Sequence, residues 1–174
     1  MKKALFLDRD GIVNEDSSYV YKKEDIIFCE GIFDFCRQAG ENGYLLIIVT
    51  NQAGVARGYF TEEDVHKLHG WMKEQFKRHG VQIDDIFYCP FHEKGRVPQY
   101  TKESYYRKPQ PGMIIEAAEK WSIDLDQSIM VGDKPSDRIK LPNLRSYIIK
   151  SRYTKDDYDF DSLESLGRFL FRKA

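Results

Sequence analysis

Two carboxylates, Asp8 and Asp10, stand one residue apart after an apolar run over residues 4–7, and Gly11 follows them. Side chains alternate faces along an extended chain, so both acids can point to one side where such a strand ends. Like charges this close are unfavourable unless a cation lies between them or they share a proton. A solvated turn is an equally good interpretation of this stretch alone, since Asp and Gly are common turn residues.

The remaining chain alternates strand and helix patterns. Short apolar runs predict five buried strands, over residues 4–7, 44–49, 86–88, 128–131 and 146–149. Apolar residues at helical spacing predict helices at 32–39, 61–76, 111–121 and 163–170. This order predicts a mainly parallel five-stranded sheet with helices on both faces, in one domain spanning residues 1–174. Residues 9–30 are expected to form a flap, with 19–21 as one arm of a short hairpin.

Ligands of open parallel sheets bind at the carboxyl ends of the strands. The polar residues expected there are Asp8, Asp10, Thr50, Asn51, Gln52, Asp133 and Lys134, with Asp137 slightly further on. Acids without a His/Cys cluster predict a hard cation bound through oxygen, and the ligand count suits Mg²⁺. An Asp beside Mg²⁺ suits attack on phosphorus through an aspartyl-phosphate, with Thr50 and the Arg107-Lys108 pair stabilising the transferred charge. Each signal is weak alone, and their position at successive strand ends makes them strong together.

Composition narrows the class of protein. Lys and Arg number 27 against 28 Asp and Glu, so the formal net charge of −1 gives no general attraction to nucleic acid or an anionic membrane. No apolar run approaches the roughly 20 residues of a membrane span, and the N-terminal run is too short for a secretory signal. Three cysteines cannot all pair, which predicts free thiols and a cytoplasmic location.

The chain resembles the haloacid-dehalogenase-type phosphatases, and most closely the subgroup of histidinol-phosphate and D-glycero-D-manno-heptose 1,7-bisphosphate phosphatases. The matching segments are 8–11, 49–58, 107–113 and 132–134 with Asp137, in the family's order. The resemblance implies a Rossmann-like three-layer sandwich, and we expect no inserted cap domain in these 174 residues. It also implies a Mg²⁺ ion held by Asp8, the backbone carbonyl of Asp10, and Asp133.

The resemblance assigns roles to individual residues. Asp8 is the nucleophile, Asp10 the general acid and base, and Thr50 and Lys108 hold phosphoryl oxygens. Residues implied in substrate binding are Asp16, Ser17, Ser18, Tyr19, Asn51, Gln52, Ala53, Arg57, Arg107 and Lys134. A plain surface turn is about as good an interpretation for any one residue of the flap 16–19.

The function implied is removal of the 7-phosphate from heptose 1,7-bisphosphate, on the route to nucleotide-activated heptose for surface polysaccharide. The expected partner is a small phosphorylated sugar, with neither nucleic acid nor membrane, and the expected state is a monomer. Three alternatives stay open: a histidinol-phosphate phosphatase, a 3′-end nucleic-acid phosphatase, and a non-catalytic phosphosugar-binding module.

One family feature is missing. Members of the subgroup often hold a structural zinc ion with a Cys-x-His pair and a Cys-x-Cys pair. Here Cys89 is followed three residues later by His92, and residues 104–107 read Ser-Tyr-Tyr-Arg. Two candidate ligands cannot complete a four-coordinate site, so we expect no zinc.

Overall fold

The strand order of the central sheet decides which loops meet. In the computed structural model, which describes residues 1–172, five strands form one sheet in the order β3-β2-β1-β4-β5, and every pairing is parallel. The strands are β1 Lys3–Leu7, β2 Tyr44–Asn51, β3 Asp85–Cys89, β4 Ile129–Gly132 and β5 Arg145–Ile148. The order reverses beside β1, because β2 and β3 lie on one side of it and β4 and β5 on the other. The predicted strands and their parallel arrangement are confirmed.

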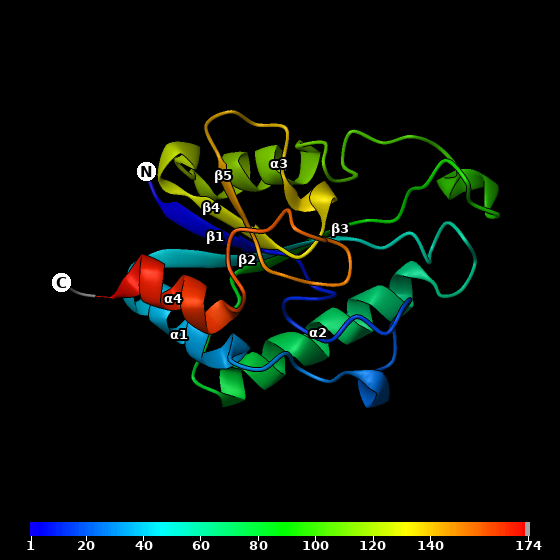
Figure 1. Cartoon of the computed structure of the whole chain (residues 1–174). Helices are drawn as coiled ribbons and strands as arrows, with labels where there is room; N and C mark the ends of the chain where they lie inside the picture. Colours follow the sequence, from blue (N-terminus) through cyan, green and yellow to red (C-terminus); the bar gives the residue numbers. More distant parts are fainter. Residues whose placement is uncertain (173–174) are drawn as a thin grey trace.

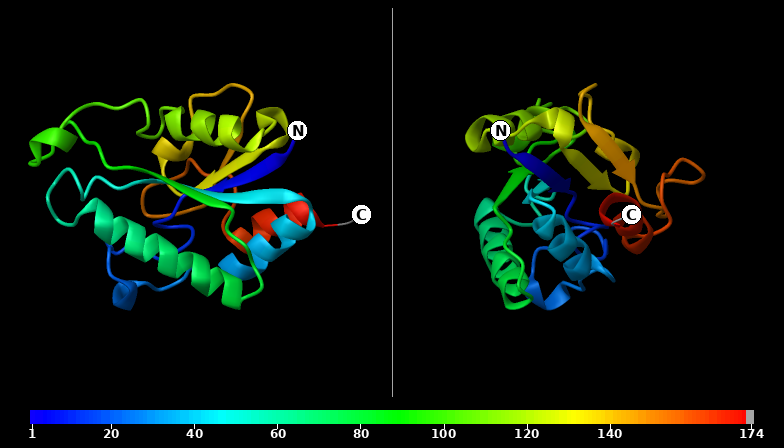
Figure 2. Two further views of the ribbon diagram at one scale, coloured as in Figure 1. Left: turned by 180° about the vertical axis from the view of Figure 1, so that it is seen from behind. Right: turned by 90° about the vertical axis from the view of Figure 1, so that its left-hand side faces the viewer.

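Four helices cover the two faces of the sheet. They are α1 Ile32–Glu41, α2 Glu62–Arg78, α3 Gly112–Trp121 and α4 Leu163–Phe171. In Figure 1 and the views of Figure 2, α3 lies on one face, while α1, α2 and α4 lie on the other. The chain is therefore a three-layer α/β sandwich, as predicted.

Alternation along the strands builds the two cores. On β1, Leu5 and Leu7 pack toward the face of α1, α2 and α4, while Ala4 and Phe6 pack toward α3. Residues of β2 divide in the same way. Both faces of these central strands are thus buried, which explains their unbroken apolar sequences.

Local signals fix where the elements begin. Thr61 and Asp64 form a reciprocal capping box at the start of α2. Four short 3₁₀ turns complete the secondary structure: η1 Lys23–Asp25, η2 Pro98–Tyr100, η3 Leu125–Gln127 and η4 Pro135–Asp137.

The flap differs from the prediction. Residues 19–21 form no hairpin arm, because Ser18 and Tyr19 adopt left-handed backbone angles (φ 65° and 54°) that interrupt an extended chain. Isolated bridges pair Asn14 with Asp10 and with Phe28 instead. The segment therefore folds as an irregular loop that passes alongside α2 (Figure 1).

Candidate active site

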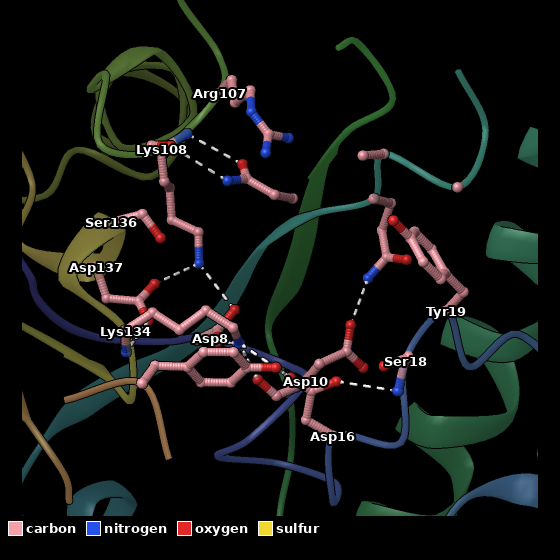
Figure 3. A pocket seen from close by; sticks show the side chains of 15 residues that line it. Asp8, Asp10, Asp16, Ser18, Tyr19, Arg107, Lys108, Lys134, Ser136 and Asp137 are labelled. Atoms are coloured by element: carbon pink, nitrogen blue, oxygen red, sulfur yellow. Dashed lines mark hydrogen bonds and ion pairs between the residues drawn. The ribbon is translucent and has the colours of Figure 1, made fainter. Parts of the chain in front are cut away.

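The ammonium group of Lys108 lies between two acids at the carboxyl edge of the sheet. Its Nζ donates to Oδ1 of Asp8 at 2.8 Å and to Oδ1 of Asp137 at 2.7 Å. All three side chains are buried. Figure 3 shows Lys108 reaching down to these carboxylates from the loop before α3. Burial lowers the pKa of Lys108, but Asp137 and Asp8 outweigh it, so the net pKa is raised and the amine stays charged.

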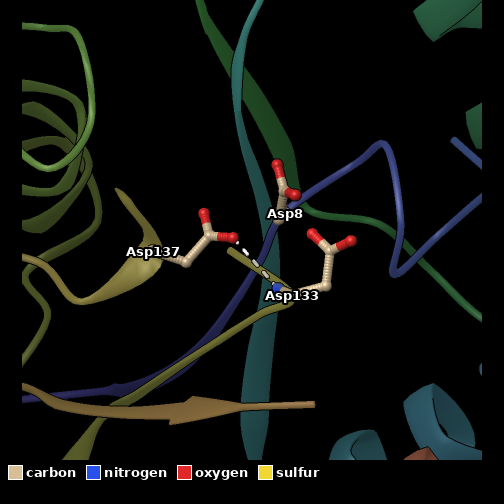
Figure 4. Close-up of side chains that lie close together, drawn as sticks. All are labelled: Asp8, Asp133 and Asp137. Atoms are coloured by element: carbon tan, nitrogen blue, oxygen red, sulfur yellow. Dashed lines mark hydrogen bonds between the residues drawn. The ribbon is translucent and has the colours of Figure 1, made fainter. Parts of the chain in front are cut away.

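Three carboxylates gather beneath this lysine. One oxygen each from Asp8, Asp133 and Asp137 lies within 4.8 Å of the others (Figure 4). Oδ2 of Asp137 accepts from the backbone N–H groups of Asp133 and Lys134, which ties η4 to the end of β4. Gly132 permits this approach, since a Cβ atom there would collide with the Asp137 side chain.

The pKa values of Asp8 and Asp133 are raised above those of ordinary carboxyl groups. Burial, and then the Asp137 charge, raises the pKa of Asp8. Burial and the Asp8 charge raise the pKa of Asp133 to about 7. Acids arranged in this way bind a proton or a cation far more readily than isolated carboxylates do.

The donor set fits a hard divalent cation. The ammonium of Lys134 lies 3.1 Å from the backbone oxygen of Asp10, 3.2 Å from Asp133 Oδ1 and 3.7 Å from Asp8 Oδ2. The three predicted ligand oxygens therefore face a common point, and a single cationic group reaches all of them. Oxygen donors of this kind, without nitrogen or sulfur, suit Mg²⁺. The side chain of Asp10 is not part of the acid cluster, so Asp10 can contribute to a metal site only through its backbone carbonyl.

The Asp10 carboxylate points toward a different set of donors. Asn14 Nδ2 and the guanidinium of Arg9 donate to Oδ1, and Gln52 Nε2 donates to Oδ2, each at 2.9–3.0 Å. Gln52 also donates to Thr50 Oγ1 at 2.9 Å. The second acid of the Asp-x-Asp pair is thus held apart from the acid cluster.

A cavity of about 270 Å³ opens above these groups. The predicted site residues that line it are Asp8, Asp10, Asp16, Ser18, Tyr19, Asn51, Gln52, Ala53, Arg107, Lys108 and Lys134. Four others do not line it, namely Ser17, Thr50, Arg57 and Asp133. Of these, Asp133 belongs to the acid cluster and Thr50 contacts Gln52.

The arginines stand at one end of the site. Arg107 lines the cavity, and the charge of Arg57 contributes, after burial, to lowering the Arg107 pKa. Arg57 Nε and Arg107 Nη1 are buried without a hydrogen-bond partner among the described residues. Buried donors normally have acceptors, so this end of the site is suited to an anion.

One wall of the cavity was not foreseen from the sequence. The Tyr153 ring lies 4.9 Å from Lys134 Nζ, and its hydroxyl donates to Asp16 Oδ2 at 2.8 Å. Arg152 adds a bond to the Asp16 carbonyl. Ser151 anchors this turn by donating to the carbonyl of Asp133. The turn after β5 therefore closes against the flap, and the only sequence signal was its position after a strand end.

Other contacts hold the loop where the subgroup carries zinc. Tyr88 and Tyr100 each donate to the Glu62 carboxylate at 2.6 Å, and Lys102 lies over the Phe91 ring. The buried Cys89 donates to the Phe91 carbonyl, and Nδ1 of His92 accepts from the backbone of Lys94. Among residues 1–172, neither Cys89 nor His92 belongs to a group of three or more side chains that could hold a metal, so these residues do not fit a closed zinc site. Tyr105 and Tyr106, in the same loop, are exposed.

Residues 4–164 match the model of a family described as polynucleotide kinase 3 phosphatase. The chain belongs to this phosphatase family. Curated relatives carry a narrower description. A D-glycero-alpha-D-manno-heptose-1,7-bisphosphate 7-phosphatase from Burkholderia mallei is 47% identical over 135 residues, which cover 78% of this chain and 71% of the relative. A Photorhabdus laumondii protein of the same name is 39% identical across 98% of this chain and 95% of its own. The corresponding beta-anomer enzyme of Vibrio cholerae is 46% identical over 78% of this chain and 73% of its own.

Solved structures agree with this family assignment. A HAD-like phosphatase from Mesorhizobium loti superposes with a TM-score of 0.84 at 30% identity, covering 99% of this chain and 88% of its own. A D,D-heptose 1,7-bisphosphate phosphatase from B. bronchiseptica, in complex with magnesium and phosphate, has a TM-score of 0.83 at 25% identity and covers 99% of both chains. No helix within residues 1–172 of this chain is long and apolar enough to span a membrane.

Proposed function

We propose that this protein is a Mg²⁺-dependent phosphatase that hydrolyses the 7-phosphate of D-glycero-D-manno-heptose 1,7-bisphosphate. The observation that carries the proposal is the position of Lys108 against Asp8, beside an acid cluster, in a chain 47% identical to a heptose-bisphosphate phosphatase. Such a reaction supplies heptose 1-phosphate for nucleotide-activated heptose and surface polysaccharide. The same assignment makes the chain a phosphoric monoester hydrolase.

In the first step, a carboxylate oxygen of Asp8 forms a bond to phosphorus and the bond between phosphorus and the sugar oxygen breaks. The electron pair stays on the sugar oxygen, which takes a proton from the Asp10 carboxyl group. Asp10 suits this role because its carboxylate faces neither Lys108 nor the acid cluster. Lys108 neutralises charge on the phosphoryl oxygens, and Thr50 is the proposed second contact.

In the second step, water attacks the aspartyl-phosphate and gives its proton to Asp10. The phosphorus–oxygen bond to Asp8 breaks, which returns the nucleophile and releases inorganic phosphate. Asp10 is then protonated again and ready for the next substrate. One residue can serve as both acid and base because the two steps transfer its proton in opposite directions.

Asp8, the carbonyl of Asp10, and Asp133 are the residues that would hold Mg²⁺. A bound Mg²⁺ would neutralise charge on the phosphoryl group and on the nucleophile. Asp137 contributes by fixing Lys108 and the end of β4, rather than as a primary ligand, because both of its oxygens already accept hydrogen bonds.

We propose that the arginine end recognises the phosphate that is not removed. Arg107 and Arg57 offer buried donors that have no partner among residues 1–172, and a phosphate monoester supplies acceptors of opposite charge. Lys134, Asn51, Gln52, Ala53 and the flap residues would contact the sugar between the two ends.

A substrate panel with inorganic-phosphate readout tests this function. Heptose 1,7-bisphosphate of both anomers, histidinol phosphate and a 3′-phosphorylated oligonucleotide should be compared in Mg²⁺ and in EDTA. We expect the bisphosphate to have the highest kcat/KM and EDTA to abolish release. A preference for histidinol phosphate would reject the heptose assignment, and absence of Mg²⁺-dependent release from every monoester would favour a binding module.

The family description makes the oligonucleotide the alternative that most needs testing. A nucleic-acid phosphatase is expected to bind DNA in a salt-dependent manner. The nearly balanced charge of this chain argues against it. Turnover of the oligonucleotide above that of the bisphosphate would reverse this choice.

A further inference from the structure

Arg9, between the two acids of the Asp-x-Asp pair, is a fully buried arginine with 1% of its surface exposed. Its guanidinium group uses all three nitrogens. Nε and Nη2 donate to the Asp10 carboxylate, Nη2 also donates to the carbonyl of Val20 at 2.8 Å, and Nη1 donates to Nε2 of His69 at 3.2 Å. An interior guanidinium is unfavourable unless its donors are satisfied, so these contacts fix the side chain in place.

These contacts join three parts of the fold. Asp10 directly follows the end of β1, Val20 lies in the middle of the flap 9–30, and His69 lies on the buried face of α2. Figure 1 shows the flap passing alongside α2 near the carboxyl edge of the sheet. A change at His69 therefore reaches Asp10 through one intervening side chain.

His69, the acceptor on α2, can accept a hydrogen bond only in its neutral form. To accept from an arginine, His69 must be neutral at Nε2. Burial first, and then the Arg9 charge, lowers the pKa of His69 well below its ordinary value, so the imidazole stays neutral. His69 is 6% exposed and has no carboxylate partner among the described residues. Within the part of the chain that the structure describes, its one side-chain hydrogen-bond partner is the guanidinium of Arg9.

We propose that His69 is a positioning residue for proton transfer: it orients Arg9, which holds the Asp10 carboxylate toward the leaving oxygen. The inference rests on the proposed function of Asp10. Without the acceptor at His69, Nη1 of Arg9 would be a buried donor lacking a partner, and the guanidinium would rotate to find one. The Asp10 carboxylate would then lose the contacts that aim it, while Asp8, Lys108 and the acid cluster would keep theirs.

The test compares His69→Gln, which keeps an acceptor, with His69→Leu, which does not. His69→Phe, which also lacks an acceptor and keeps a planar ring, replaces the leucine variant if that protein does not fold. His66→Leu is the matched control, because His66 lies one turn earlier on α2 with an exposed side chain. Each protein is assayed with heptose 1,7-bisphosphate, whose sugar oxygen needs a proton, and with an aryl phosphate, whose phenolate leaves without one.

For His69→Leu we expect kcat/KM on the sugar phosphate to fall about tenfold, part of the roughly 10²–10⁴-fold contribution of general acid catalysis. On the aryl phosphate the fall should be less than about threefold, since proton transfer contributes little there. His69→Gln and His66→Leu should stay close to wild type on both substrates. An equal loss on the two substrates, or no loss on either, would overturn the proposal.

Crystal structures of the variants give a readout that does not depend on activity. The Asp10 carboxylate should keep its contacts in His69→Gln and leave them in His69→Leu. If the wild type fails to hydrolyse the heptose substrate, the proposed function fails, and these structures still decide the role of His69. An Asp10 carboxylate in the same place in all variants would overturn the inference.

Discussion

Replacing Lys108 with methionine tests the central contact of the site. The substitution keeps most of the side-chain volume and removes the ammonium that lies 2.8 Å from Asp8 and 2.7 Å from Asp137. The exposed fractions of the three side chains are 2%, 7% and 1%, so water cannot replace the lost partner. Removing one member of a buried pair costs about 3–5 kcal/mol. Two acids lose their nearest cation at once, and Asp8 keeps only the longer 3.7 Å contact with Lys134, so we expect the upper part of that range.

Urea denaturation monitored by circular dichroism, at pH 7 and in EDTA, measures this loss. Lys120→Met is the matched control, because Lys120 contacts Asp85 at an equal 2.7 Å but is 58% exposed. An exposed pair is worth less than about 1 kcal/mol. If Lys108→Met destabilises the protein no more than Lys120→Met, the view of Lys108 as the counter-charge of two buried acids is wrong.

The pH dependence gives a second check. Losing Lys108 raises the folded-state pKa of Asp8 further above its unfolded value. The native state then binds more protons than the unfolded state, so stability falls as pH rises through this window. The deficit of Lys108→Met relative to wild type should therefore be larger at pH 8 than at pH 5. A deficit independent of pH would contradict the electrostatic explanation.

Further predictions concern single residues. Asp8→Asn should reduce phosphate release to background while circular dichroism and the unfolding midpoint show an intact fold; retained turnover would exclude Asp8 as nucleophile. Tyr153→Phe removes the bond to Asp16, worth about 0.5–1.5 kcal/mol, so steady-state assays should show KM raised about 2- to 10-fold. Below pH 6.5 the unfolded chain protonates His69 while the native chain does not. The free energy of unfolding of the wild type, measured in urea, should therefore fall by up to about 1.4 kcal/mol per pH unit relative to that of His69→Gln. Equal pH dependence of the two unfolding free energies would contradict this. Metal analysis should find no stoichiometric zinc, and one zinc per chain would show that Cys89 has unforeseen partners.

The sequence predicted the sheet because the strands are buried on both faces. An apolar run such as residues 44–49 is typical of a strand buried on both faces. Strands connected by helices pair in parallel. The carboxyl-end rule then brought Asp8, Thr50 and Asp133 to one edge. These inferences succeed since they depend on local pattern and on general properties of open sheets.

What the sequence left undecided lies in irregular segments. Ser18 and Tyr19 adopt left-handed backbone angles, which their residue types do not predict. Tyr153 reaches Asp16 only because the turn after β5 folds back over the site. Loop conformation depends on distant partners, which a local pattern cannot supply.

The amino-acid sequence by itself determined the layers, the edge at which the polar residues meet, and the oxygen-donor chemistry of the acids at that edge. Only the tertiary structure decided how those residues divide: Lys108 pairs with Asp8 and Asp137, whereas Asp10 turns to Arg9, Asn14 and Gln52. The physical reason is that a side chain's charge partner is selected by packing in three dimensions. Residues 8 and 10 are almost adjacent in the chain, yet burial and neighbouring donors give them separate environments.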